Sequence, residues 1–291
     1  MSKLIFVFTM CVLLLTLSLI LFDKYKNNDK EEVAYSIKSS YAYLSNDSET
    51  IFDVRLYTSS KKSLIKYASS SIANIHDKSK DTIINVDVLD VYQISNTTYY
   101  DENFYEYSLS LKVLMNDLNI KDAYLTLNFT NKAYTFYLGS IDIKENIYKD
   151  NELKIVDLYG VSSKDNISLA GIVMTISNQR NQSMEITDVI IGDDFNVILD
   201  TNYVTEVKES VYVEDYLNND INNDGYLEIE ANSSKTFILP IEYLNDYYLY
   251  NCYLIIYGDD FTYLLSNYNY INSNDLEGLE VYLFKGIIYD I

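Results

Sequence analysis

Four stretches between residues 84 and 138 carry apolar side chains at every second position, and this period constrains the fold more than any other feature of the chain. Residues 105–113 are the longest example, with tyrosine, leucine or valine at each odd position and Glu, Ser or Lys at each even one. Residues 84–88, 123–129 and 134–138 repeat the period. Because successive side chains of a strand point to opposite faces, a period of two predicts antiparallel sheets with one buried and one solvated face.

The remainder of the chain also favours short strands separated by turn residues, with no alternation of strands and helices that would indicate a parallel sheet. In the second part, strands are expected at residues 167–177, 184–191, 195–199, 203–213, 226–230, 235–241, 247–257, 261–265 and 279–289. The sequence therefore predicts a mainly β protein with two tandem antiparallel β-sandwich domains.

A drop in hydrophobicity over residues 143–157 separates the two predicted domains. We expect a first β domain at residues 27–147 and a second, Ig-like sandwich at residues 148–291. Residues 60–75 have apolar side chains at helical spacing, so an α+β first domain, with a helix packed on a curved sheet, is the alternative.

The chain begins with an apolar run at residues 4–22, interrupted only by two threonines and a serine. Nineteen residues of helix would extend about 28 Å, close to the roughly 30 Å of a bilayer core. We predict an uncleaved transmembrane anchor within residues 1–26. A cleaved signal is the alternative, but the run is longer than the ~7–15 residues of a signal core and no small-residue cleavage site follows it. Lipidation at Cys11 would need a small residue before it, where Met10 stands.

The orientation of this anchor has evidence on both sides. Lys3 precedes the apolar run, whereas Lys24, Lys26 and Lys30 follow it, and the positive-inside rule would place the body in the cytoplasm. Large domains are translocated largely regardless of such charges, and a short basic segment before an apolar run is typical of export. We expect a single-pass protein of the cell membrane with an extracytoplasmic body.

The net charge limits the class of partner. With 43 acidic and 22 basic residues the chain carries −21, which argues against nucleic acid, because binding to phosphates requires Lys and Arg. It also argues against adhesion of the body to anionic lipid headgroups. The expected contacts are the membrane, through the N-terminal helix, and a protein or other component of the cell envelope.

The residues that carry catalysis in many enzymes are scarce. His76 is the single histidine and lies in a polar segment where solvent exposure is expected. Cys252 is the single cysteine of the body and lies in an apolar segment, which predicts a buried, inert thiol. With no nucleophile–base pair and no repeated His/Cys metal set, we expect no enzymatic activity and no cofactor.

One segment resembles the start of a calcium-binding loop. Oxygen-bearing side chains alternate along it before Gly225, at positions from which they can converge on one ion. The candidate ligands are Asp220, Asn222, Asp224, Glu228 and Glu230. The twelfth position, where a bidentate glutamate belongs, is Ala231, so a hairpin turn entering a strand is the competing interpretation.

Two further features allow binding without requiring it. Residues 190–195 and 255–261 both run from an apolar strand through Gly-Asp-Asp to phenylalanine, which indicates similar turns whose aspartates could serve as ligands. Tyrosines gather at residues 247–257 and again at 268 and 270, where they could stack on sugars. A chain with 31 tyrosines and no tryptophan produces such clusters by composition alone.

Residues 167–178, which end in Asn178, with the following strands at 186–191 and 227–241, resemble the Ig-like sandwiches of prokaryotic cell-surface proteins. The resemblance covers roughly residues 155–265. It implies an extracytoplasmic adhesive or scaffold module and assigns no site residues. We therefore expect a membrane-anchored, non-enzymatic interaction or adhesion module, the alternative being a ligand-sensing, calcium-binding or carbohydrate-binding ectodomain of an envelope complex.

Overall fold

The structure is a computed structural model. It describes residues 16, 18, 31–45, 48–99, 102–115, 117–146, 153–164, 169–197, 210, 212–216, 226–245, 247–258, 262–271 and 282–291. The chain divides into two units, Met1–Val33 and Ala34–Ile291, and the described strands all belong to the second. Of the predicted anchor at residues 4–22, only Thr16 and Ser18 are described. Among the described residues, no helix is both long enough and apolar enough to cross a bilayer.

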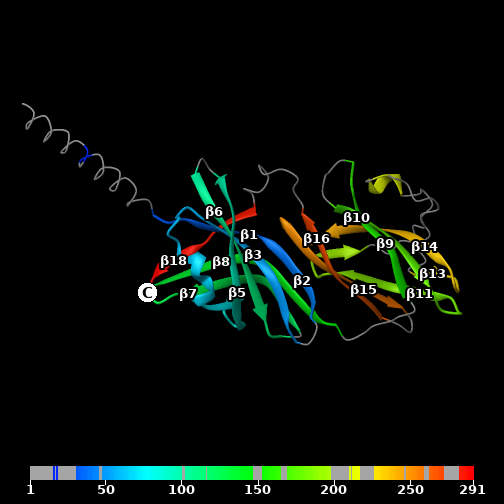
Figure 1. Cartoon of the computed structure of the whole chain (residues 1–291). Helices are drawn as coiled ribbons and strands as arrows, with labels where there is room; N and C mark the ends of the chain where they lie inside the picture. Colours follow the sequence, from blue (N-terminus) through cyan, green and yellow to red (C-terminus); the bar gives the residue numbers. More distant parts are fainter. Residues whose placement is uncertain are drawn as a thin grey trace, which may run out of the picture. The chain divides into compact units, whose positions relative to one another are not determined.

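The described part of the chain is mainly β, which confirms the predicted class (Figure 1). Two lobes share its strands. The first lobe contains β1 (Ala34–Ile37), β2 (Ser39–Ser45), β3 (Thr50–Thr58), the 3₁₀ helix η1 (Leu64–Ser70), β4 (Ile72–His76), β5 (Ile83–Tyr99), β6 (Glu102–Val113), β7 (Leu118–Asn128) and β8 (Lys132–Glu145), together with the last two strands, β17 (Leu283–Lys285) and β18 (Ile287–Asp290).

The second lobe lies between β8 and β17 in the sequence. Its elements are β9 (Leu153–Ser162), β10 (Leu169–Asn178), β11 (Met184–Ile191), β12 (Phe195–Val197), the 3₁₀ helix η2 (Val213–Asp215), β13 (Leu227–Ile229), β14 (Ser234–Tyr243), β15 (Leu249–Gly258) and β16 (Thr262–Ile271). The predicted domain boundary at residues 147/148 lies outside the described residues.

The period of two decides which side chains enter the core of the first lobe. In β3, Phe52, Val54 and Leu56 are buried, whereas Asp53 and Arg55 between them are exposed. The even positions of β3 and the odd positions of β6 meet β7 in one hydrophobic cluster, where β7 changes from even to odd positions at its irregularity after Ile120. Each fully buried aliphatic or aromatic side chain there contributes roughly 1.5–3 kcal/mol.

The helix considered for residues 60–75 is limited to η1, and β4 follows it directly. The Ser63 hydroxyl accepts a hydrogen bond from the Ile65 N–H at 3.2 Å and so caps the start of η1. Tyr67 leaves helical geometry, η1 ends at Ser70, and the extended Ser71 leads into β4. Ile65 and Ala68 are buried in the core cluster, so η1 is a short cover on the strands rather than the packed helix of an α+β domain.

The sheet of the first lobe curls over its own core. The long strand β5 pairs with β4 through residues 83–86 and with β6 through residues 87–99, so it belongs to both sides of the curl. At the other end, β1 pairs with β3, and after Lys38 the chain continues as β2, which pairs with β8. The segment that contains β1 and β2 therefore contributes a strand to each side of the curled sheet around the core.

Two four-stranded layers form the second lobe. One has the order β12-β14-β10-β9, and the other has the order β13-β11-β15 with β16 beside β15. All pairs within both layers are antiparallel. Residues of both layers share a single hydrophobic cluster, so the layers face each other across one core.

Strand β2 joins the lobes and corrects the prediction of purely antiparallel sheets. It lies parallel to β8 through residues 39–45 and parallel to β15 through residues 39–41, which makes the fourteen-stranded sheet mixed. Gly139 of β8 permits the close approach, because it has a φ of +111° and a Cβ there would lie 2.1 Å from the Ser39 carbonyl oxygen. These partners are far apart in the sequence, so a local period could not reveal them.

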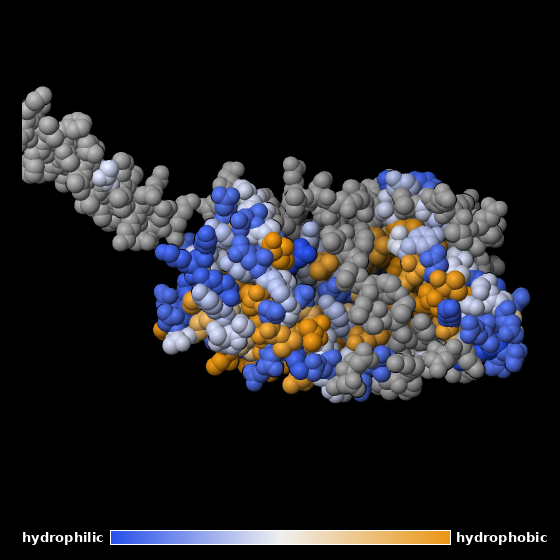
Figure 2. All heavy atoms as spheres, viewed as in Figure 1, coloured by the Kyte–Doolittle hydropathy of each residue, from blue (hydrophilic) through white to orange (hydrophobic). Residues whose placement is uncertain are grey.

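The last strands return to the first lobe. β17 pairs antiparallel with β1, and β18 pairs antiparallel with β8. The exposed hydrophobic side chains of the described residues include Ile287 and Tyr289 of β18. On the face that Figure 2 shows, hydrophobic residues gather in patches among hydrophilic ones.

Candidate functional site

The structure describes two of the five predicted calcium ligands. Glu228 lies in the middle of β13 with its side chain directed away from the core, opposite Glu185 of β11. Glu230 is exposed just after the strand. Asp220, Asn222 and Asp224 lie outside the described residues, so the calcium loop stays a prediction. Among the described residues, no group of three or more His, Cys, Asp or Glu side chains could hold a metal ion.

His76 and Cys252 are both buried. The prediction of an exposed histidine is wrong, because His76 faces the neighbouring strand and its ring stacks on Tyr124 at 5.7 Å. Its ring nitrogens lie 2.7 Å from the Asp77 carbonyl oxygen and 3.0 Å from the Thr126 hydroxyl. The Cys252 thiol lies in the core of the second lobe, as predicted, and burial raises its pKa. Burial and a raised pKa both lower the reactivity of the Cys252 thiol.

The tyrosines of residues 247–257 serve mainly as core. Tyr247, Tyr250 and Tyr253 are almost fully buried, so they cannot stack on a sugar. Tyr250 stands near the start of β15, and its hydroxyl donates to the Asn245 carbonyl oxygen at 2.7 Å and accepts from the Tyr247 N–H at 2.9 Å. The hydroxyl thereby closes the turn between β14 and β15.

The first Gly-Asp-Asp turn reaches into the boundary between the lobes. Gly192, at a φ of +56°, lies against Ala42 of β2, and Asp194 is 4% exposed. The Asp194 carboxylate accepts hydrogen bonds from the Ser40 hydroxyl at 2.5 Å and the Ser140 hydroxyl at 2.6 Å. The Asn245 amide donates to its other oxygen at 3.0 Å. Among the described residues no ion pair involves Asp194, so hydrogen bonds alone compensate the buried charge.

A second carboxylate lies beside it. Asp142 of β8 accepts hydrogen bonds from the Tyr253 hydroxyl and, at 3.3 Å, from the Asn119 amide. The Lys144 ammonium lies 3.8 Å from Asp142 and 3.1 Å from Asp193. The Asn119 amide also donates a hydrogen bond to Asp193. We call this set the junction network; its members are Ser40, Asn119, Ser140, Asp142, Lys144, Asp193, Asp194, Asn245 and Tyr253.

The junction network has an excess of negative charge, with three carboxylates and one ammonium group. Burial raises the pKa of Asp142 to about 6, against the lowering effects of the Tyr253 hydroxyl and Lys144. Its hydrogen bonds link β2, β7 and β8 of the first lobe to the turn after β11 and to β15 of the second. The hydrogen bonds of the junction network therefore fix the position of one lobe relative to the other.

On the other side of β2 lies a cleft of about 900 Å³, within the range of ligand-binding pockets. We call it the β2–β3 cleft. It forms where the chain after β1 leaves β3 and moves to β8 and β15. Its lining comes from β1 to β3, β5, β6 and the start of β15: Ile37, Ser39, Tyr41, Tyr43, Leu44, Glu49, Thr50, Ile51, Phe52, Asp53, Arg55, Ile94, Ser108, Ser110, Tyr248, Leu249 and Asn251.

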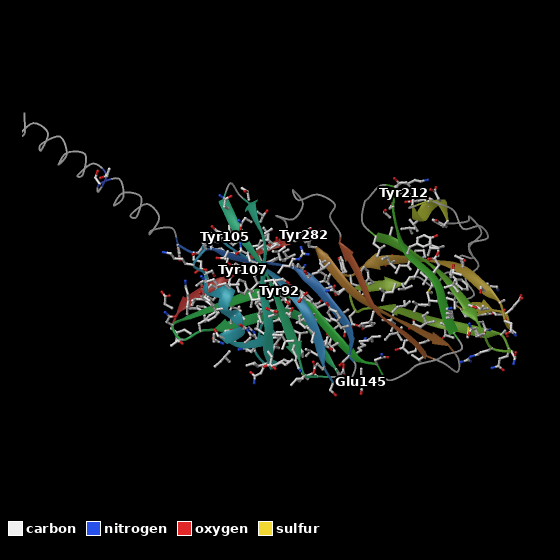
Figure 3. All side chains as sticks on the ribbon, in the orientation of Figure 1. Tyr92, Tyr105, Tyr107, Glu145, Tyr212 and Tyr282 are labelled. Atoms are coloured by element: carbon white, nitrogen blue, oxygen red, sulfur yellow. The ribbon has the colours of Figure 1, made fainter. Side chains whose placement is uncertain are left out.

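Aromatic rings form one wall of the cleft. Phe52 packs against Tyr41 at 5.1 Å and against Tyr43 at 5.7 Å, and burial raises the pKa of both tyrosines. Tyr248 packs against Tyr282 at 5.8 Å, and Tyr282 is labelled in Figure 3. These contacts fix the wall before any ligand arrives.

Polar side chains form another part of the wall of the cleft. Glu49 pairs with Lys112 at 2.6 Å, and the half-exposed Arg55 lies 3.6 Å from the buried Glu106. Asp53 accepts a hydrogen bond from the Ser110 hydroxyl at 2.5 Å and forms no ion pair with a described residue. Within the described part of the chain, the Asp53 carboxylate of the cleft therefore has no cation beside it.

Thr50 adds an unsatisfied group to this wall. Its residue is 6% exposed, and its hydroxyl oxygen has no hydrogen-bond partner among the described residues. Buried hydroxyls without a partner are uncommon in folded proteins, and this oxygen is itself closed to solvent.

No protein-family model matches this chain, and no curated protein matches it. The site's interpretation therefore depends on its own geometry. Sequence reasoning identified neither the cleft nor the junction network, because both assemble residues from distant strands.

Proposed function

We propose that this protein is a non-enzymatic interaction or adhesion module of the cell envelope, and that it binds its partner in the β2–β3 cleft. The cleft is the observation that carries the proposal. It has the volume of a ligand site, an aromatic wall held by its own packing, and a second wall with a carboxylate that lacks a cation.

The proposal includes an Ig-like architecture for the second lobe. In an Ig sandwich, strands A, B, E and D form one sheet and C, F and G form the other. The orders β9-β10-β14-β12 and β11-β15-β16 are consistent with this arrangement, with β13 as an additional strand beside β11. The Tyr250 hydroxyl bond to Asn245, at the turn into the sixth strand, also favours it. Ig-like lobes serve many functions, so this supports the architecture and leaves the function to the cleft.

The non-enzymatic part of the proposal is supported by the state of the two groups most suited to chemistry. His76 has both ring nitrogens within hydrogen-bond distance of the protein, and Cys252 is a buried thiol with a raised pKa. The membrane anchor at residues 4–22 and the extracytoplasmic body are supported by the length of the apolar run and by the resemblance to surface sandwiches.

Site-specific photo-crosslinking in intact cells tests the proposal. A photoreactive residue replaces Ile94, half-exposed in the cleft, or Val156, similarly exposed on β9 of the other lobe. We expect a discrete crosslinked species from position 94 and none from position 156. Added protease should remove the body from intact cells. Equal silence at both positions, or a body protected by the membrane, would contradict the proposal.

A further inference from the structure

The β2–β3 cleft is bordered by the edge of a strand. Residues 50–55 of β3 pair with β6 on one side, and on the other side they pair with no strand in the described part of the chain. The pairing of β1 with β3 ends at residues 36 and 56, after which β1 continues with β17 and the chain moves away as β2. The backbone groups of this part of β3 that point away from β6 thus face the cleft.

The lining residues support the same geometry. Thr50, Ile51, Phe52 and Asp53 all line the cleft, although successive side chains of a strand point to opposite faces. Four consecutive residues can border one cavity only if the cavity lies along the strand's edge. An unpaired edge of this kind is a template for another strand.

We infer that the β2–β3 cleft binds an extended, basic peptide segment of a partner protein, which adds a strand to the free edge of β3. This inference rests on the proposed function and specifies its partner. In this mode the main-chain hydrogen bonds supply affinity, and alternate side chains of the peptide supply specificity.

Charge and apolarity indicate the sequence of the segment. Asp53 lies on the outer face of β3 and forms no ion pair with a described residue, so a lysine or arginine of the peptide can pair with it. The chain's net charge of −21 favours a basic partner at long range as well. Phe52, which lines the cleft from the opposite face of β3, offers apolar contact to the alternate positions of the same peptide.

The test uses the full chain in detergent and a fluorescent octapeptide of alternating valine and lysine with blocked ends. We expect saturable binding by fluorescence polarisation. A valine–glutamate octapeptide should bind at least roughly tenfold more weakly, since it reverses the pairing with Asp53. The valine–lysine peptide with alternate backbone nitrogens methylated should lose binding, because it cannot form a ladder. Maltoheptaose tests a sugar ligand and should not compete.

Two variants locate the charge contact. Asp53→Asn should weaken binding of the valine–lysine peptide by roughly tenfold, the value of one charge-assisted pair. Asp188→Asn, at an exposed position of β11 in the other lobe, is the matched control and should change nothing. Equal weakening by both variants would mean that the peptide responds only to net charge, which overturns the inference.

Amide hydrogen exchange locates the backbone contact. Bound peptide should slow the exchange of amides within residues 50–55 and leave unchanged those of β9, a strand that pairs only with β10 among the described strands. Protection of β9 instead, competition by maltoheptaose, or a dimer that blocks the cleft would each overturn the inference. If Ile94 crosslinks to a partner in cells while the peptide does not bind, the proposed function stands and strand addition is wrong.

Discussion

Replacing Asp142 by asparagine should remove a measurable pH dependence from the stability of the fold. Burial raises the pKa of Asp142 from 3.8 to about 6, so the ionised carboxylate is disfavoured in the folded state. Between these two values the folded protein binds one proton more than the unfolded chain. Stability from this group is therefore fully present below about pH 4, falls as the pH rises towards 6, and is constant above it.

The magnitude follows from the shift. A difference of about two units at ~1.4 kcal/mol each gives about 3 kcal/mol over the full range. Only part of this free-energy difference can be measured. At lower pH the carboxylates of a chain with a net charge of −21 become protonated, and the repulsion between molecules is lost. From pH 7.5 to pH 5, integration of the linkage equation gives a gain of about 1.4 kcal/mol.

Urea denaturation followed by tyrosine fluorescence measures this gain, since the chain has no tryptophan. The Asp142→Asn variant keeps a carbonyl oxygen as acceptor and should lack the gain, whereas Asp157→Asn, at an exposed position of β9, should retain it. Other titrating groups cancel when each variant is compared with the parent at both pH values. An unchanged pH slope in Asp142→Asn would refute the reasoning.

Three other substitutions or modifications test the packing. Gly139→Ala should destabilise the fold by about 2 kcal/mol or more, because its Cβ would meet the Ser39 carbonyl oxygen and its φ is +111°. In the same urea assay, Gly160→Ala should destabilise the fold less, because its Cβ would meet only the Leu169 side chain. Tyr250→Phe should cost about 1–3 kcal/mol through its two lost hydrogen bonds, and Tyr212→Phe, on the surface, about zero, both read as the shift in denaturation midpoint. Cys252 should resist iodoacetamide in the folded protein and react once urea unfolds it, as followed by peptide mass spectrometry.

The local period of the sequence predicted the strands of the first lobe and their buried faces. Leu109, Leu111 and Val113 enter the core as the alternation in residues 105–113 requires. The pairing of strands could not be predicted from the sequence, because neighbours such as β2 and β15 are separated by most of the chain and carry no complementary pattern. Pairing depends on the total packing of the lobe, whereas the period depends on each strand alone.

The Gly-Asp-Asp turn shows the same limit for polar residues. In the sequence, Asp193 and Asp194 are ordinary turn residues, and a solvent-exposed position is the usual one for aspartate. The structure buries Asp194 because Ser40 and Ser140 supply two hydroxyl donors from strands of the other lobe. No feature within residues 190–195 could reveal these donors, since they are set by the register of β2 against β8.

The alternation along β2 connects the junction network to the cleft. Ser39, Tyr41 and Tyr43 line the cleft, while Ser40 holds Asp194 and Ala42 packs with Tyr253 on the opposite side. A rotation of a strand that moves the side chains on one face also moves those on the other face. The hydrogen bond from Ser40 to Asp194 therefore also fixes the aromatic wall of the cleft. Asp194 forms no ion pair with a described residue, and its hydrogen-bond donors come from both lobes. These hydrogen bonds keep β2 in the orientation that borders the cleft beside the edge of β3.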